Sequence, residues 1–491
     1  MLSSNLAHSL GAIGTIWLVA EWAIRIVSLL IVPRNRKPSS ATAWLLVIFF
    51  FPTVGFLIFL IIGSPKLPKS RRAAQKTLDG FITSTLQEFR KHDGQKLLSA
   101  KPPEKFTPLA RLSESLSHLP VFGGNKIDIL PEYDQVIDQI LADIQQAKSF
   151  VYLEYFIIAL DDVTEPIFVA LADAVKRGVS VHVLYDSLST KRMANAKGMI
   201  QRLKDDGVIA QPMLPLKLGR GYVRPDLRNH RKIAVIDGQI GYTGSLNLVQ
   251  RNYHRKDEIY YDELVVRMQG PVVLQLAAVF LTDWYSETGV ILRQDTPVAE
   301  RVKIKDYGGS LAQVLPSGPG YDDENNLKLF TSLIHTAQKR VVITNPYFVP
   351  DDALTTAMTS AAKRGVEVIL INSEVMDQWM VGHAQRSFYE IMLKAGIKIY
   401  WYKAPILLHS KFMTVDGEIA TVGSSNLDIR SFELNLEVTL ISYDPKVVAG
   451  LQKVETTYIG RSQQVTLKEW QKRPKHTVLI DNIARLTSAV Q

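Results

Sequence analysis

The chain has 491 residues, 46% of them hydrophobic, and a formal net charge of +9. This length exceeds the size at which a single hydrophobic core stops growing, so we expect two compact units and something smaller. The sequence contains no cysteine, which excludes disulfides, zinc-thiolate sites and cysteine nucleophiles but leaves the cellular compartment open. The positive charge fits an anionic lipid surface and a nucleic acid equally well.

Two apolar stretches begin the chain, at residues 11–32 and 41–63. Each is long enough to cross a hydrocarbon layer of roughly 30 Å, and together they predict a transmembrane hairpin. Glu21 and Arg25 lie within the first stretch at a spacing that lets them pair on one helix face, and a re-entrant or interfacial helix is the alternative there. For both stretches, a buried helix of a soluble protein is the other alternative.

The cations that flank the two stretches predict their orientation. Three cations lie in the loop between them, and five follow the second stretch, namely Lys66, Lys69, Arg71, Arg72 and Lys76. The larger group marks the cytoplasmic side. We therefore expect a multi-pass protein of the cell membrane, with the remainder of the chain on the cytoplasmic face.

Four segments are predicted along the chain, which are a membrane hairpin at 1–65, a polar connector at 66–118 and two similar domains at 119–296 and 297–491. Helices are predicted over 133–147, 165–177, 325–338 and 352–364, and strands over 150–158, 179–185, 340–347 and 366–371. This alternation predicts an α/β fold built from two pseudo-equivalent domains. The basic segment from Lys468 onward packs on its domain or forms an amphipathic element against lipid headgroups.

One pattern, H-x-K-x4-D-x6-G-S-x-N, occurs twice, shifted by 179 positions. The first copy consists of His230, Lys232, Asp237, Gly244, Ser245 and Asn247, and the second of His409, Lys411, Asp416, Gly423, Ser424 and Asn426. Alternation places the His and the Lys on one face of a strand. Asp-Gly predicts a hairpin, with returning strands at 240–243 and 419–422. A solvated His and Lys on a polar strand face is the alternative for a single copy.

Lysine and histidine suit the chemistry of a phosphodiester. The substrate is anionic, so a site without metal needs fixed cations on the phosphate oxygens and a nucleophile that is neutral near pH 7. Lys232 and Lys411 are expected to neutralise the phosphate, and the Gly-Ser and Asn positions of both copies to complete an anion-binding rim. Asp237 and Asp416 are candidates for catalysis, with a structural role at the turn as the alternative.

The duplicated pattern resembles the motifs of the phospholipase D superfamily, whose members join two copies at a pseudo-twofold axis to form one active site. Residues 41–65, 217–247 and 395–440 resemble bacterial cardiolipin synthases. The closest phrases are Asp226-Leu-Arg-Asn-His-Arg-Lys232, Asn345-Pro-Tyr-Phe-Val-Pro350 and Asn426-Leu-Asp-Ile-Arg-Ser431. The resemblance implies two pseudo-twofold related domains, each a mixed β-sheet flanked by helices, after a transmembrane helical hairpin.

The resemblance also implies a reaction, in which a phosphatidyl group passes from one phosphatidylglycerol to another with release of glycerol. His230 would be the nucleophile that forms a phosphohistidine, and His409 the general acid and then the base; the near-identical motifs leave the reverse assignment open. Glu263 and Glu437 match positions that support the histidines, with a surface ion pair as the alternative.

No metal, nucleotide or other cofactor is expected, and the expected partners are phosphatidylglycerol, other anionic lipids and the bilayer, without nucleic acid. Hydrolysis of phospholipids is the main alternative activity. A nuclease and a lipid-binding scaffold with an inert site are further alternatives. Tyr155, Tyr347 and Arg430 are weaker candidates for the pocket. The oligomeric state is not readable from the sequence.

Overall fold

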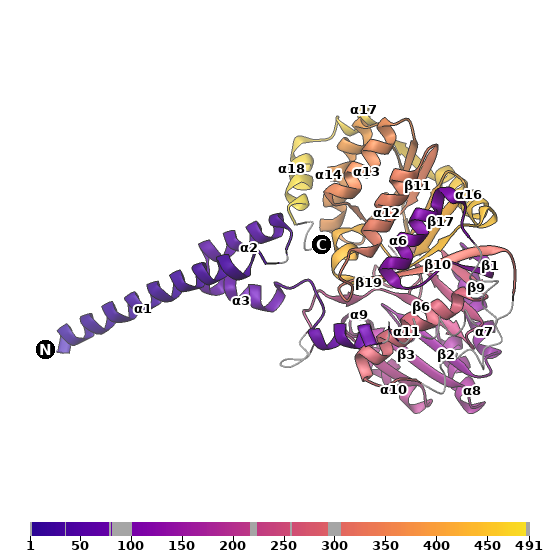
Figure 1. Cartoon of the computed structure of the whole chain (residues 1–491), viewed down its shortest axis with the longest axis horizontal. Coiled ribbons are helices and arrows are strands. Elements are labelled where there is room, and N and C mark those ends of the chain that lie inside the picture. The colour runs from indigo at the N-terminus through magenta and orange to yellow at the C-terminus, as the bar shows by residue number, and fades with distance from the viewer. Residues whose placement is uncertain are drawn as a thin grey trace. The chain divides into compact units, whose positions relative to one another are not determined.

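The computed structural model describes residues 2–34, 36–77, 80, 101–216, 223–255, 258–292 and 306–487. The chain forms two compact units, residues 1–67 with 224–226 and residues 68–223 with 227–491 (Figure 1). Much of the predicted connector, the predicted boundary at 296/297 and the start of the stretch at 217–247 lie outside the described residues.

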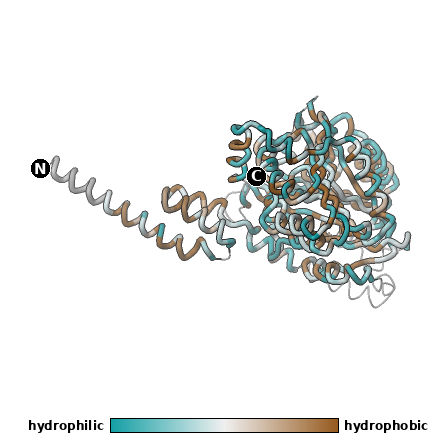
Figure 2. The backbone as a smooth tube through the Cα atoms, turned by 90° about the horizontal axis from the view of Figure 1, so that it is seen from above, coloured by the Kyte–Doolittle hydropathy of each residue, from teal (hydrophilic) through white to brown (hydrophobic). Residues whose placement is uncertain are grey.

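The N-terminal unit contains three helices, α1 (Leu2–Ile31), α2 (Pro38–Phe50) and α3 (Pro52–Ile62). In α1 the window Gly14–Ile31 is long and apolar enough to cross a membrane, with a mean hydropathy of 1.6. Figure 2 shows the hydrophobic residues of this unit along its helices. Arg25 Nη1 lies 3.4 Å from Glu21 Oε2, so the ion pair predicted within the first apolar stretch is present.

The second apolar stretch is not the single span predicted over 41–63. It divides at Phe51, whose φ of −131° and ψ of 72° leave the helical region. Pro52 causes the break, because a proline disfavours the helical conformation of the residue before it and lacks an N–H to continue the ladder. At 13 and 11 residues, α2 and α3 are about 20 and 17 Å long, short of a bilayer core of about 30 Å.

Helix α3 folds back onto α2. The rings of Trp44 and Phe59 lie 5.5 Å apart, although seven and eight residues separate them from the break at Phe51. Gly55 permits the close crossing, since a Cβ at this position would lie 2.9 Å from the carbonyl oxygen of Val47. The second stretch is therefore a compact helical hairpin rather than one transmembrane helix.

The larger unit contains both copies of the pattern, and its elements recur in the same order. The first repeat consists of β1 (Phe122–Leu130), α7 (Tyr133–Gln145), β2 (Phe150–Tyr155), α8 (Glu165–Lys176), β3 (Ser180–Asp186), α9 (Ser187–Lys191), α10 (Ala196–Asp205), β4 (Ile209–Met213), β5 (Arg228–Asn229), β6 (Lys232–Ile236), β7 (Ile240–Gly244), β8 (Tyr260–Asp262), β9 (Val265–Gln269) and α11 (Val272–Thr288). The helices and strands predicted in this repeat are confirmed to within a few residues.

The second repeat consists of β10 (Ser310–Ser317), α12 (Asn325–Thr336), β11 (Arg340–Thr344), β12 (Phe348–Val349), α13 (Asp352–Lys363), β13 (Glu367–Ser373), α14 (Trp379–Lys394), β14 (Lys398–Tyr402), β15 (Ile406–Leu408), β16 (Phe412–Val415), β17 (Ile419–Gly423), β18 (Leu427–Asp428), α15 (Ile429–Glu433), β19 (Asn435–Ser442) and α16 (Pro445–Gly460). It is followed by β20 (Ser462–Val465), α17 (Leu467–Trp470) and α18 (Lys475–Arg485). The elements predicted here are also confirmed.

One sheet passes through both repeats, in the order β20-β14-β13-β11-β16-β17-β19-β10-β1-β9-β7-β6-β2-β3-β4. The repeats meet where β1 pairs with β10 antiparallel, with Phe122 opposite Ala312. On each side of this junction, a parallel group of three strands follows an antiparallel group that contains the His-x-Lys segment. The two predicted domains thus share a continuous sheet.

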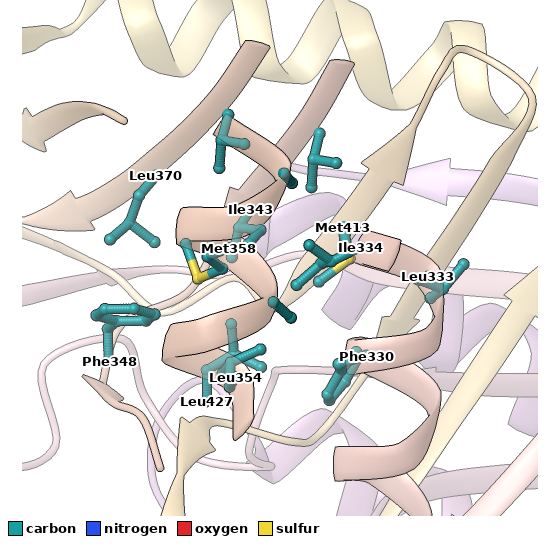
Figure 3. Packing of buried hydrophobic residues seen from close by; sticks show 14 of the residues in the cluster. Phe330, Leu333, Ile334, Ile343, Phe348, Leu354, Met358, Leu370, Met413 and Leu427 are labelled. Atoms are coloured by element: carbon teal, nitrogen blue, oxygen red, sulfur yellow. The ribbon is translucent and has the colours of Figure 1, made fainter. Parts of the chain in front are cut away.

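Helices α12 and α13 cover one face of the second half of the sheet, and Figure 3 shows how they pack there. Phe330 and Ile334 of α12 and Met358 of α13 meet strand residues such as Ile343 and Met413. Two elements of the predicted connector, the short helix η1 (Glu104–Phe106) and α6 (Thr107–Ser117), add Phe106, Leu109 and Ala110 to this core. The end of the connector is therefore part of the packed unit, because one face of α6 is apolar.

Candidate active site

The two histidines and two lysines of the pattern are buried together at the junction of the repeats. His230 and His409 are 7% and 4% exposed, and Lys232 and Lys411 are 2% and 3% exposed. Each Lys immediately precedes or begins its strand, and its Nζ donates a hydrogen bond of 2.7 Å to the carbonyl oxygen of the His in its own copy. This contact turns each ammonium back toward its histidine.

Each histidine is held by a glutamate from the other repeat. His230 Nδ1 lies 2.9 and 3.0 Å from the two carboxylate oxygens of Glu437. His409 Nδ1 lies 2.9 Å from both oxygens of Glu263. An ionised carboxylate accepts hydrogen bonds only, so Nδ1–H is the donor and Nε2 is left with its lone pair free for chemistry.

Two short parallel strand pairs produce this exchange. Strand β5, just before His230, pairs with the start of β19, just before Glu437. Strand β15, just before His409, pairs with β8, just before Glu263. The backbone continues both ladders, because His230 N–H donates to the carbonyl oxygen of Leu436 at 2.9 Å and His409 N–H to that of Asp262 at 2.7 Å. Backbone pairing between repeats thus sets the position of both imidazoles.

Burial and the neighbouring cations lower the pKa values of the histidines and lysines in the site. Burial, followed by the charges of Lys232 and Lys411, places the pKa of His230 well below its usual value. Burial also lowers the pKa of Lys232 to about 7 and that of Lys411 to about 8, although the nearby glutamates oppose it. His230 is therefore neutral near pH 7, while the lysines titrate near that pH.

The two glutamates differ electrostatically. Burial raises the pKa of Glu437 to about 7 despite the neighbouring Lys232. Burial also opposes ionisation of Glu263, but the charge and hydrogen bond of His409 outweigh it, and the pKa falls to about 2. Glu263 consequently favours the protonated form of His409 more strongly than Glu437 favours that of His230. The pKa of His409 is still below the ordinary value, because burial dominates.

The Gly-Ser positions support the glutamates. Ser424 Oγ donates to Glu437 at 2.5 Å and accepts from the N–H of Val438 at 3.0 Å. Ser245 Oγ accepts from the N–H of Leu264 at 2.9 Å, beside Glu263. Gly423 lets β17 approach β19, since a Cβ there would lie 2.3 Å from the carbonyl oxygen of Val438. The structure places these residues behind the carboxylates, whereas the sequence predicts them on an anion-binding rim.

The two asparagines of the pattern are buried, with exposed fractions of 3% for Asn247 and 7% for Asn426. Asn247 Nδ2 donates to the hydroxyl of Tyr253 at 3.1 Å. The Oδ1 atoms of Asn247 and Asn426 are buried and have no hydrogen-bond partner among the described residues. A buried amide oxygen without a partner is costly, so each Oδ1 atom has spare capacity to accept a hydrogen bond from a ligand.

The structure places Asp237 and Asp416 at the turns between the hairpin strands, both with a positive φ, 54° and 55°. Asp237 accepts from the backbone N–H groups of residues 148–150 at 2.7 to 3.0 Å. Asp416 accepts from those of residues 338–340 at 2.7 to 2.9 Å, and from Lys105 Nζ at 2.5 Å. Each Asp lies five residues along an extended segment from its Lys, roughly 16 Å away, so these carboxylates fasten the helix-to-strand loops.

Aromatic rings pack against both imidazoles. Phe156 lies 4.8 Å from the ring of His230, whereas Tyr261 and Tyr347 lie 5.4 and 6.3 Å from that of His409. Of the weaker candidates, Tyr347 is therefore beside the site and Tyr155 is in the hydrophobic core of the first repeat. Arg430 is close enough for its charge to contribute to the lowered pKa of His230.

Two supporting residues were not predicted from the sequence. Asp377 accepts from the hydroxyls of Tyr347 and Tyr261 at 2.7 and 3.0 Å, and no local pattern marks it. Arg231 is fully buried between His230 and Lys232, bonds to Asp283, and donates to the carbonyl oxygen of Glu437 at 3.0 Å. Its place in the alternation, on the opposite strand face from His230, is the signal that could have identified it.

Comparisons with known proteins agree with this arrangement. The family described as "Cardiolipin synthase, PLD-like domain" matches residues 140–284 and 330–455, and the family "Phospholipase_D-nuclease N-terminal" matches residues 21–64. Cardiolipin synthase A of Pectobacterium carotovorum subsp. carotovorum is 33% identical over 460 residues, which are 93% of this chain and 94% of that protein. Cardiolipin synthase A of Proteus mirabilis is 33% identical over 444 residues, 90% of each chain.

A solved structure shares the fold. The crystal structure of phosphatidylserine synthase from Haemophilus influenzae Rd KW20 matches with a TM-score of 0.59 at 16% identity, covering 78% of this chain and 99% of that one. The paired His-x-Lys segments on one mixed sheet define a protein of the phospholipase D superfamily. Within it, the chain belongs to the family of bacterial cardiolipin synthases.

Proposed function

We propose that this enzyme makes cardiolipin from two molecules of phosphatidylglycerol. The observation that carries the proposal is the exchanged pair of His-Glu contacts, flanked by two buried lysines, in a chain 33% identical to cardiolipin synthases over 93% of its length. Such a site offers a neutral nucleophile, a proton donor and two cations for one phosphodiester.

In the first step His230 Nε2 attacks phosphorus and the bond to the glycerol headgroup breaks. His409 gives its proton to the departing oxygen, so that glycerol leaves and a phosphatidyl-histidine remains. In the second step His409 removes a proton from a glycerol hydroxyl of another phosphatidylglycerol. That oxygen attacks phosphorus, the P–N bond breaks, and His230 is restored.

The electrostatics support this division of roles. A nucleophilic imidazole must be neutral, and the pKa of His230 lies well below its usual value because of burial and neighbouring cations. A general acid must carry a proton, and although burial lowers the pKa of His409, the charge and hydrogen bond of Glu263 oppose that shift, whereas the pKa of His230 lies well below its usual value. Lys232 and Lys411 would hold the phosphate oxygens, and the unpaired Oδ1 atoms of Asn247 and Asn426 would accept from a hydroxyl of the substrate.

Burial of the site supports transfer to an alcohol over hydrolysis. The two His and two Lys residues are each 7% exposed or less, so bulk water has limited access to the reacting atoms. A phospholipase D activity remains the competing function for the same residues.

Reconstitution into vesicles of phosphatidylglycerol, without nucleotide or added divalent metal, tests the proposal. We expect cardiolipin and glycerol in equal amounts. Phosphatidic acid as the main product would identify a hydrolase, and an absence of lipid turnover would refute both functions. A His230→Ala variant should lose the covalent lipid adduct, and loss of the adduct only in His409→Ala would reverse the two roles.

A further inference from the structure

The exposed face of α18 carries an apolar stripe. Leu479, Ile483 and Leu486 are 60%, 54% and 84% exposed, and their spacing of four and three residues places them on one side of the helix. The inner side packs on α14 (Figure 1). In this contact the guanidinium of Arg485 lies 4.4 Å from the ring of Phe388. The stripe is thus an unburied face of a docked helix.

The part of this face that α18 forms has exposed cations but no exposed carboxylate among the described residues. Between Trp470 and Thr487 the sole acidic residue is Asp481. Asp481 is only 1% exposed and points inward, where it contacts His383 Nδ1 at 2.7 Å and Arg473 at 2.6 Å. Lys472, Lys475 and His476 are exposed at the start of the helix. Apolar side chains next to cations match the interface of an anionic bilayer.

The same face continues to the rim of the active site. Asp377 bonds to the two tyrosines that pack against His409, and two residues later α14 begins with Trp379, which is 62% exposed. The ring of Trp379 lies 4.4 Å from that of His383, the imidazole that holds Asp481 of α18. A series of contacts therefore connects His409 with the exposed face. The exposed Trp379 also fits a membrane surface, because tryptophan is enriched at membrane interfaces.

We infer that α18 and the start of α14 form an interfacial docking surface, which lies in the headgroup region of the anionic bilayer and brings the rim of the site to its lipid substrates. This inference rests on the proposed function only in naming those substrates. The surface defined by Trp379, Leu479, Ile483 and Leu486 would lie about 5–10 Å deep, at the boundary of headgroups and acyl chains.

The test uses the absence of cysteine in the natural chain. Full-length Leu479→Cys and Ile483→Cys variants are labelled with a fluorophore and reconstituted into phosphatidylglycerol vesicles. The matched control is Val169→Cys, an apolar position that is 42% exposed on α8, at the opposite end of the unit in Figure 1. Quenchers attached to lipid chains and aqueous iodide then report the surroundings of each label.

We expect the labels on α18 to be quenched by the lipid-attached quencher and shielded from iodide, and the Val169→Cys label to show the reverse. Labels on α18 that iodide quenches as strongly as the control would overturn the inference. Shielding from both quenchers would also overturn it, because protein, either the N-terminal helices or a second copy, would then cover the face. This readout needs no turnover, so failure of the proposed function alone would leave it intact.

Activity gives a second measurement. Leu479→Gln with Ile483→Gln should raise the KM for phosphatidylglycerol in vesicles about tenfold, because two apolar interfacial contacts are lost. The rate with detergent-dispersed substrate should remain that of the natural enzyme, as should both rates for Val169→Gln. An unchanged KM in vesicles would contradict the inference.

Discussion

The exchanged His-Glu contacts make a residue-scale prediction. Glu437→Gln and Glu263→Gln keep the side-chain shape but lose the acceptor-only carboxylate that fixes each imidazole, so cardiolipin formation should fall on the order of 10³-fold in each. The two variants should differ by step. With Glu437→Gln the formation of the adduct should be the step that slows, whereas with Glu263→Gln its formation and its breakdown should both slow, because His409 is the acid of the first step and the base of the second. Rapid quenching with radiolabelled lipid distinguishes them, and the opposite pattern would exchange the histidines' roles.

Because the pKa values of both lysines are lowered, we expect activity to decline as the pH becomes alkaline. Burial lowers the pKa of Lys232 to about 7 and of Lys411 to about 8, so the free enzyme loses its phosphate-binding cations as the pH rises through this range. The value of kcat/KM should therefore decline from about pH 7 upward, while phosphodiesters keep a constant charge. A profile that stays level to about pH 9.5 would show that the lysines remain protonated before substrate binds.

The lowered pKa of Lys232 also means that the protonated residue destabilises the folded state. Between the folded pKa of about 7 and the ordinary value of 10.5, unfolded Lys232 holds a proton that the folded site has released. The unfolded state then binds more protons, so stability rises with pH across this window and is lowest below it. Lys232→Met should accordingly raise the free energy of unfolding by about 1–4 kcal/mol at pH 7 while abolishing activity. Thermal unfolding at pH 7 and 10 measures both the gain and its pH dependence.

At the scale of elements, the hairpin turns carry the next prediction. Asp237→Asn and Asp416→Asn lose charge-assisted hydrogen bonds to three backbone N–H groups each, which should lower stability by about 1–3 kcal/mol. The rate of the folded protein should change only a few-fold, because these carboxylates lie far from the histidines.

Glu418→Gln is the control for this experiment. Its half-exposed carboxylate lies 3.4 Å from the same lysine, Lys105, and a surface pair of this kind contributes about 0–1 kcal/mol. Thermal unfolding and activity below the unfolding temperature separate the two effects. A catalytic role for Asp237 or Asp416 would instead appear as a large loss of rate without a loss of stability.

Local patterns in the sequence were sufficient for most elements. The strands that follow His230 and His409 are short, largely apolar runs, and Asp-Gly marks their turns, so neighbouring residues determine both hairpins. The break at Phe51 has an equally local cause in Pro52, but the continuous hydropathy of the stretch concealed it. The apolar face of α6 was similarly hidden in a polar segment.

The exchange of glutamates could not be predicted in this way. It depends on strand pairs of two and three residues between segments that lie about 150 to 200 positions apart in the sequence. Such short strands have no periodicity of their own, and only the assembled sheet brings them together. The position of Asp377 beside the two tyrosines depends on the same long-range packing.

At the scale of the whole molecule, one chain contains both members of each His-Glu pair. A mixture of His230→Ala and His409→Ala chains, reconstituted in the same vesicles, should therefore remain inactive. Recovery of about a quarter of the natural activity would indicate that two chains share their histidines in mixed dimers, as random pairing of swapped halves would produce. Co-reconstitution of natural and variant chains provides the reference activity.

Because both His-Glu pairs lie in one chain, the two pairs can differ from each other. In a symmetric dimer of single repeats, both His-Glu pairs would be identical, and any change would alter the two together. Within one chain, Arg231 stands in the first copy where Ser410 stands in the second, and the pKa of Glu437 is about 7 where that of Glu263 is about 2. Fusion of the copies thus permits each imidazole to be tuned for a single task, although neither half can work without the carboxylate of the other.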